Sequence, residues 1–202
     1  MASATITGNV TTEQCFPARR AFRFISPSVT TTSSIRANWQ EGASAWNNNP
    51  TPGYGTHITG VGAQGSEDAD GTNGFDWQPS GNPSMFTFNA NTQQWSAVTS
   101  TLGTLTAGTG YRMLIRGSRS TNLQSNAAAP SNTILRTSGT VVKGPVAVSG
   151  LPSTASQYVL VGNPFHAIIN MNTVKSNSTN LTNTFWIWDP TLGGNPIVGQ
   201  PG

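Results

Sequence analysis

Lysine, charge and long apolar runs are scarce in this chain of 202 residues, and each scarcity excludes a class of protein. Only 8% of the residues are charged, whereas about a quarter are charged in an ordinary globular protein. The lysines are Lys143 and Lys175, so the clustered basic face that nucleic acids require is missing. No apolar run approaches the ~18 residues of a membrane-spanning helix. We therefore expect neither a nucleic-acid partner nor a transmembrane segment.

Cysteine is nearly absent too, because Cys15 is the single cysteine of the chain. One cysteine excludes a disulfide bond within the chain. Residues 14–17 offer no histidine or asparagine that would make Cys15 a nucleophile, and a lone thiol commonly packs as a small apolar group. We therefore expect Cys15 in the core.

Short polar residues take the place of charge, since Thr, Ser, Gly and Asn make up nearly half of the chain. Six tryptophans and eight phenylalanines supply large core anchors, each able to bury ~150–250 Å². The net charge of +3 rests mostly on arginines within alternating apolar runs, residues 19–24 and 111–119. This alternation predicts that the arginines lie on the solvent face of strands.

The spacing of apolar residues predicts an all-β protein. Apolar residues alternate, or form short runs bounded by Gly, Pro, Asn and Ser, which is the strand pattern. We predict strands at residues 4–10, 20–25, 56–61, 84–88, 95–98, 110–115, 133–142, 158–161 and 185–188. A turn at residues 89–91 predicts a hairpin, and a helix is expected only at residues 34–41, behind a Ser34 cap. Strands of this number and spacing favour a β-sandwich, Ig-like or jelly-roll-like.

A modest boundary near residues 127–132 divides the sequence into two β-rich halves, residues 1–130 and 131–202. The halves could form two small sandwiches in tandem. We expect them to pack as one unit.

Acidic residues gather in one loop, which is a candidate site for structural calcium. Most of the seven acidic residues of the chain lie at residues 67–76. Asp68, Asp70, Asn73 and Asp76 offer oxygen ligands at short spacing, and the glycines between them allow the backbone to curl around an ion. A solvated acidic turn is the alternative. No other cofactor is expected.

Aromatic residues in polar, turn-rich sequence suggest a carbohydrate-binding surface as a second hypothesis. Trp46 and Tyr54 are the residues that we expect to be exposed for sugar rings. The run at residues 185–188 is predicted as a strand, and Trp186 or Trp188 is expected to fill the core.

Catalytic motifs are missing from the sequence, so we expect a protein that is not an enzyme. No Gly-rich phosphate loop or Gly-x-Ser-x-Gly motif is present. A remote alternative is a hydrolase whose site is assembled from distant residues, namely Asp76, Asp189 and either His57 or His166.

Eight segments carry a resemblance that covers almost the whole chain. They are residues 16–24, 35–42, 53–60, 73–76, 81–86, 111–117, 160–165 and 188–192. In this order they resemble a module of large secreted surface proteins of Bacteroidota, often exported by the type IX route with a C-terminal sorting domain. The resemblance implies adhesin-like or matrix proteins and supplies no catalytic residues. No sorting domain follows here, and residues 67–70 extend the acidic loop, so the resemblance does not imply calcium binding.

Together these observations predict a secreted structural or adhesive protein of the cell surface. Its expected partners are copies of itself, other surface proteins or a polysaccharide. Scarce lysine removes one common guard against strand pairing between molecules. We therefore hypothesise filaments in which residues 4–10 or 194–202 complete the sheet of a neighbouring copy.

Overall fold

The chain has an all-β, sandwich-like fold built from two antiparallel sheets, as the sequence predicted. The computed structural model describes residues 6–61, 71–152, 154–179, 181–182 and 184–190. Its elements are β1 (Val10–Phe16), β2 (Ala21–Ile25), β3 (Val29–Thr30), α1 (Ile35–Trp39), the 3₁₀ turn η2 (Thr72–Gly74), β4 (Met85–Asn89), β5 (Gln94–Ala97), β6 (Tyr111–Ile115), β7 (Thr133–Val141) and α2 (Met171–Ser176).

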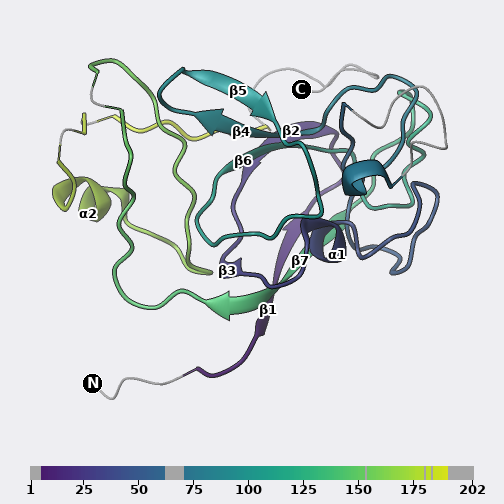
Figure 1. Cartoon of the computed structure of the whole chain (residues 1–202), viewed down its shortest axis with the longest axis horizontal. Coiled ribbons are helices and arrows are strands. Elements are labelled where there is room, and N and C mark those ends of the chain that lie inside the picture. Colours follow the sequence, from purple (N-terminus) through teal and green to yellow (C-terminus); the bar gives the residue numbers. More distant parts are fainter. Residues whose placement is uncertain (1–5, 62–70, 153, 180, 183, 191–202) are drawn as a thin grey trace.

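The strands are arranged in sheets of three and four, in the orders β1-β7-β3 and β2-β6-β4-β5 (Figure 1). β1 pairs with β7 along its full length, from Val10 opposite Gly139 to Phe16 opposite Thr133. β7 follows residue 130 in sequence, so the first sheet combines strands from both predicted halves. The division of the chain into two units stays a prediction.

Burial in β7 follows the two-residue period of a strand that has one covered face. Thr133, Leu135, Thr137 and Gly139 are buried, and the residues between them are partly exposed. Gly139 has a specific reason to be glycine, because a methyl group there would overlap the carbonyl oxygen of Thr30 in β3. The absence of a side chain thus allows β3 to lie close to β7.

The hydrophobic core lies between the sheets and is capped by α1. Buried apolar side chains from β2, β4, β6, β7, α1 and the connecting loops form one cluster, which comprises Ile25, Ile35, Trp39, Ile58, Phe75, Met85, Leu105, Tyr111, Met113, Ile115 and Leu135. Trp39 is completely buried, and its Nε1 donates to Thr137 Oγ1 at 2.9 Å. This hydrogen bond satisfies the polar atom of the indole, which would otherwise be costly to bury.

The helix α1 forms where the sequence predicted it. The side chain of Ser34 caps it by accepting a hydrogen bond from the amide of Ala37 at 3.0 Å. Ile35, Asn38 and Trp39 are its buried residues, so one face of the short helix covers the core.

The outer face of the four-stranded sheet carries a layer of aromatic rings around one arginine. The guanidinium of Arg112 lies over the rings of Phe22, Phe86 and Trp95, with centroid distances of 4.3, 4.9 and 5.1 Å. Such contacts stabilise a cation that has lost part of its hydration. The expectation that the arginines of the two alternating runs lie on the solvent face of strands is wrong, because Arg23 in β2 and Arg116 directly after β6 are buried, at 9% and 7% exposure.

Five of the nine predicted strands are present, each with its ends within one residue of the predicted ones. The predictions at 20–25, 84–88, 95–98, 110–115 and 133–142 correspond to β2, β4, β5, β6 and β7, and the hairpin of β4 and β5 is confirmed.

Four strand predictions are wrong where the structure describes them. The first strand begins at Val10, not before it, and residues 56–61, 158–161 and 185–188 form no strand. Residues 56–60 are fully buried, but side chains replace the strand partner: the amide of Ile58 donates to Asp76 and that of Thr59 to Ser84. Because these residues are buried, their composition is that of a strand, although no main-chain ladder pairs them with a neighbouring strand.

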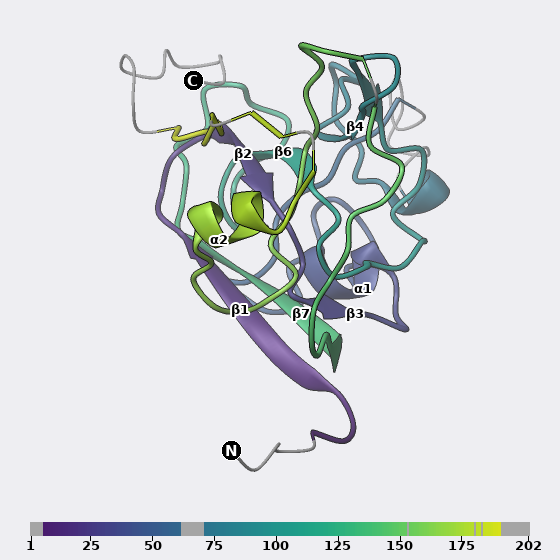
Figure 2. The same cartoon turned by 90° about the vertical axis from the view of Figure 1, so that its left-hand side faces the viewer.

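The region after β7 differs from the rest of the molecule in how little of it is buried. Among the residues that the structure describes, every buried one lies between Thr12 and Gly139, and none after Gly139 is buried. Trp186 and Trp188 are 76% and 48% exposed, so the expectation that one of them fills the core is wrong. Figures 1 and 2 show this region, which includes α2, passing along one side of the sheets.

Candidate functional site

The free edge of β1 is the most distinctive feature of the surface. Within the described residues β1 pairs with β7 alone, so its other main-chain edge lies beside no strand. Thr11, Glu13 and Cys15 are the exposed residues of this strand. Soluble proteins usually guard such an edge with charged side chains, above all lysine, with proline or with a bulge. β1 contains no lysine or proline, and Glu13 is its one charged residue. The strand is therefore a template for pairing with another chain.

The expectation that Cys15 lies in the core is wrong, because Cys15 is exposed. The two-residue period of β1 explains this: Thr12 is buried, so the odd-numbered residues from Thr11 to Cys15 face outward.

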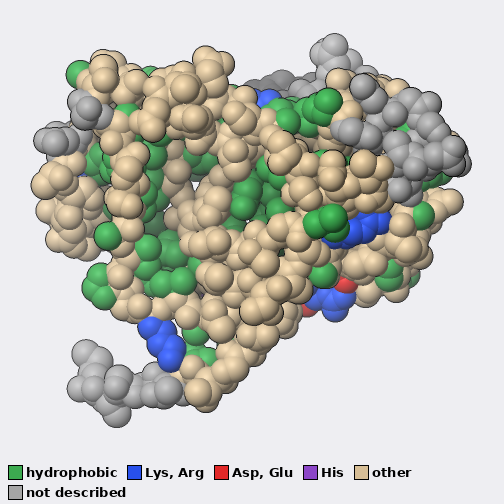
Figure 3. Space-filling view, viewed as in Figure 1, with side chains coloured by type: hydrophobic (Ala, Val, Ile, Leu, Met, Phe, Trp, Pro, Cys, Tyr) green, Lys and Arg blue, Asp and Glu red, His purple; other side chains and the backbone are tan. Residues whose placement is uncertain are grey.

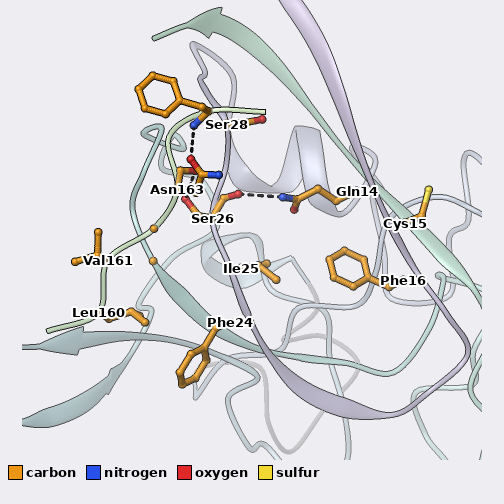
Figure 4. Close-up of a pocket in the computed structure, with 13 residues that line it drawn as sticks. Gln14, Cys15, Phe16, Phe24, Ile25, Ser26, Ser28, Leu160, Val161 and Asn163 are labelled. Atoms are coloured by element: carbon orange, nitrogen blue, oxygen red, sulfur yellow. Dashed lines mark hydrogen bonds between the residues drawn. The ribbon is translucent and has the colours of Figure 1, made fainter. Parts of the chain in front are cut away.

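A cavity of about 490 Å³ lies beside the last residues of β1. We call it the β1–β2 cavity. Residues from β1, from β2 and the turn after it, and from the C-terminal region line it, namely Gln14, Cys15, Phe16, Phe24, Ile25, Ser26, Ser28, Gly110, Leu160, Val161, Gly162, Asn163 and Phe165 (Figure 4). Figure 3 shows the surface hollowed beside the C-terminal region, with apolar side chains inside the hollow.

The polar groups of this cavity are already bonded to one another. Gln14 Nε2 donates to the Ser26 carbonyl oxygen at 3.2 Å, and Ser26 Oγ donates to the Asn163 carbonyl oxygen at 3.3 Å. Ser28 Oγ donates to Thr12 Oγ1 at 3.2 Å. None of the lining residues is charged. The surface that the cavity offers an occupant is therefore uncharged and divided about equally between polar and apolar atoms.

The residues predicted for sugar binding lie at the surface, but neither is a freely exposed ring. Trp46 is half-buried and packs against Trp77, with ring centroids 5.8 Å apart. Tyr54 is half-buried, and the guanidinium of Arg136 covers one face of its ring at 4.3 Å.

The residues predicted to bind calcium fall into two groups. Asp68 and Asp70 lie outside the described residues. Asn73 lies in η2, where its carbonyl oxygen accepts hydrogen bonds from the Thr101 amide and from Ser100 Oγ. Asp76 is fully buried and faces arginine. Because the carboxylate oxygens of Asp76 are already bonded to protein donors, calcium binding by this loop stays a prediction that depends on Asp68, Asp70 and the exposed side chain of Asn73.

Asp76 and Arg119 form a buried ion pair at the centre of several loops. Nη1 and Nη2 of Arg119 donate to the two carboxylate oxygens, each at 2.8 Å. The Nε2 of Gln40 and the amide of Ile58 donate to Oδ2 at 2.9 and 3.1 Å. The remaining donors of Arg119 reach the carbonyl oxygens of Ala45, Asn48 and Thr56. One buried ion pair thus ties together loops distant in sequence.

His57 completes this group. Its Nε2 lies 3.1 Å from the carbonyl oxygen of Thr121 and donates to it, and its Nδ1 lies 3.6 Å from Asp76 Oδ2. Burial by itself raises the pKa of Asp76, but His57 and Arg119 oppose this effect and hold that pKa well below its usual range. Asp76 is therefore ionised in the folded protein at neutral pH.

The residues of the hydrolase hypothesis are partly brought together. His57 and Asp76 are neighbours, with exposures of 1% and 0%, whereas His166 and Asp189 lie on the surface. The carboxylate of Asp76 is enclosed by protein donors. In this structure it balances the charge of Arg119 and has no surface open to a substrate.

Sequence reasoning missed the two features that organise this molecule, the edge of β1 and the partner of Asp76. β1 was missed because its apolar residues are few. The pairing of Arg119 could have been predicted from the sequence. Arginines within apolar runs need buried partners, and this chain has few charged residues that could serve.

Comparison of the chain with protein-family models, with curated proteins and with solved structures finds no match. Within the described part of the chain, no helix is long and apolar enough to cross a membrane.

Proposed function

We propose that this chain is a secreted, non-enzymatic structural or adhesive protein of the cell surface, which assembles with copies of itself by β-strand addition. The observation that carries the proposal is the free edge of β1, seven residues long and with Glu13 as its one charged residue. Main-chain donors and acceptors on such an edge bind an added strand without any requirement for particular side chains.

The composition supports the same proposal. A surface of hydroxyl and amide groups stays hydrated, and with 8% charged residues two copies meet little electrostatic repulsion. The resemblance to secreted surface proteins of Bacteroidota agrees with a role outside the cell.

The test is electron microscopy and sedimentation of the purified full chain at physiological salt, with and without calcium. We expect filaments or sheets for the natural sequence. The double variant Thr11→Lys/Cys15→Lys places two charges on β1 and should leave monomers. Gln94→Lys/Ser96→Lys is the matched control, since it places the same charges on exposed positions of β5, the edge of the other sheet. Monomers of the natural chain at every concentration would contradict the proposal.

A carbohydrate-binding role is the second candidate, favoured by the pair of half-buried rings Trp46 and Trp77. Aromatic faces bind the apolar faces of sugar rings. If this role is correct, Trp46→Ala should abolish retention on a polysaccharide column, whereas Trp186→Ala, at a ring 76% exposed elsewhere, should not. Equal retention of the two variants would remove Trp46 as the site.

A further inference from the structure

We propose that the β1–β2 cavity and the free edge beside it are the acceptor for the N-terminal arm, residues 6–9, of a second copy. This inference rests on the proposed self-assembly and assigns its two contact sites. The main chain of the arm would extend along the edge of β1, and the side chain of Ile6 would enter the cavity.

The acceptor combines two elements that strand addition requires. The edge of β1 offers main-chain hydrogen bonds, and the cavity lies where that edge ends, at Gln14 and Phe16. In strand addition the main chain provides affinity, and pockets for alternate side chains provide specificity. Figure 4 shows the rings of Phe16 and Phe24 and the side chain of Leu160 around the space between them.

The chemistry of the cavity favours a peptide over a small polar ligand. Its volume of about 490 Å³ lies in the range of ligand sites, but such sites present several convergent polar groups to their ligand. Here the side chains of Gln14 and Ser26 donate to backbone carbonyl oxygens, and the hydroxyl of Ser28 donates to that of Thr12. An uncharged strand matches this lining, because its main chain can bond to polar atoms while an apolar side chain contacts the apolar ones.

The arm has the matching properties of a donor. Residues 6–9 are exposed, and Ile6 is an apolar side chain left 48% exposed. The sequence before Val10 contains no charged side chain, which fits an uncharged cavity. Figure 2 shows β1 and the residues before it projecting from the body of the molecule. Within the described residues, Lys143 Nζ donates a hydrogen bond to the Ile6 carbonyl oxygen at 2.9 Å.

The positions of donor and acceptor determine the form of the assembly. The arm leaves β1 at Val10, and the cavity lies near the opposite end, at Phe16. Contacts between two different surfaces of identical subunits do not close on themselves unless the rotation allows a ring. A copy that donates its arm to one neighbour and accepts the arm of another extends a linear filament, whereas two copies that exchange arms form a closed dimer; sedimentation of the natural chain distinguishes the two forms.

The decisive experiment mixes two full-length variants, each with one damaged contact site. Ile6→Asp places a charge on the donor and leaves the cavity intact. Val161→Asp places a charge in the lining of the cavity, at a residue 51% exposed, and leaves the arm intact. Val148→Asp, at a residue 50% exposed outside the lining, is the matched control.

We expect each of the first two variants to sediment as a monomer and the control to assemble like the natural chain. An equimolar mixture of Ile6→Asp and Val161→Asp should give a species of twofold molar mass and no longer polymer, because each such dimer exposes only a damaged arm and a damaged cavity. Circular dichroism of each variant verifies the fold.

Two results would overturn the inference. If the natural chain assembles but either variant still does so, or their mixture stays monomeric, the arm and the cavity are not partners, while self-assembly stands. If the natural chain itself remains monomeric, both this inference and the proposed self-assembly fail.

Discussion

Arg119 holds Asp76 through both of its carboxylate oxygens, at 2.8 Å each, in a site where both side chains are fully buried. A pair of this geometry restrains the loops that carry it. Breaking this pair should therefore lower the free energy of unfolding by more than breaking a surface ion pair would.

Asp76→Asn should destabilise the protein by about 3–5 kcal/mol, because it leaves the charge of Arg119 buried without a counter-charge. Urea unfolding followed by circular dichroism measures the change. The double variant Asp76→Asn/Arg119→Met removes both charges and should cost less than the single variant. If the double variant were the less stable of the two, the ion pair would not be the source of the effect.

Stability should fall in acid through Asp76. The folded pKa of Asp76 is held well below that of an unfolded aspartate, which is near 4, because His57 and Arg119 outweigh the effect of burial. A carboxylate with a depressed folded pKa stabilises the fold fully above about pH 5, and this contribution declines as the pH falls toward the folded pKa.

The measurement is the urea midpoint from pH 7 to pH 3. The natural chain should lose more stability over this range than Asp76→Asn/Arg119→Met, in which the carboxylate is absent. Parallel pH profiles for the two proteins would contradict the assignment to Asp76.

Gly139→Ala should destabilise the three-stranded sheet by about 1–3 kcal/mol, because the added methyl group overlaps the Thr30 carbonyl oxygen and forces β3 away from β7. Gly103→Ala is the control, since a methyl group at Gly103 meets no atom within 4 Å. Thermal unfolding compares the two. Equal melting temperatures would mean that β3 does not lie where the structure places it.

Cys15 should react with a thiol reagent in the native protein. Its side chain is exposed on β1, so a chromogenic disulfide should modify one thiol per chain without denaturant. Assembly through the edge of β1 should slow this reaction, and Thr11→Lys should restore the monomer rate. Modification that occurs only after unfolding would show that β1 is covered in solution.

The sequence was informative wherever a residue pattern depends on local geometry. The alternation in β2, β6 and β7, the turn between β4 and β5, and the Ser34 cap of α1 were all predicted. Each of these depends on neighbours along the chain. The all-β class followed from the same local signals.

Predictions from the sequence were wrong or missing where contacts between residues distant in sequence determine the structure. Residues 56–60 look like a strand but satisfy their amides with the side chains of Asp76 and Ser84. β1 has the sequence VTTEQCF, with a buried threonine instead of an apolar alternation, and becomes a strand because β7 pairs with it. The pairing of Asp76 with Arg119 joins residues 43 positions apart, which no local pattern encodes.

The burial boundary at Gly139 implies a gradient of local stability along the chain. Amide protons of β6 and β7 exchange with solvent only when the core opens, whereas those of residues 142–152 and 154–179 exchange through small fluctuations that leave the sheets intact. A protease would accordingly cut this region first and release a resistant fragment that contains both sheets. The molecule thus keeps its rigidity in one part of the chain and its adaptability in another.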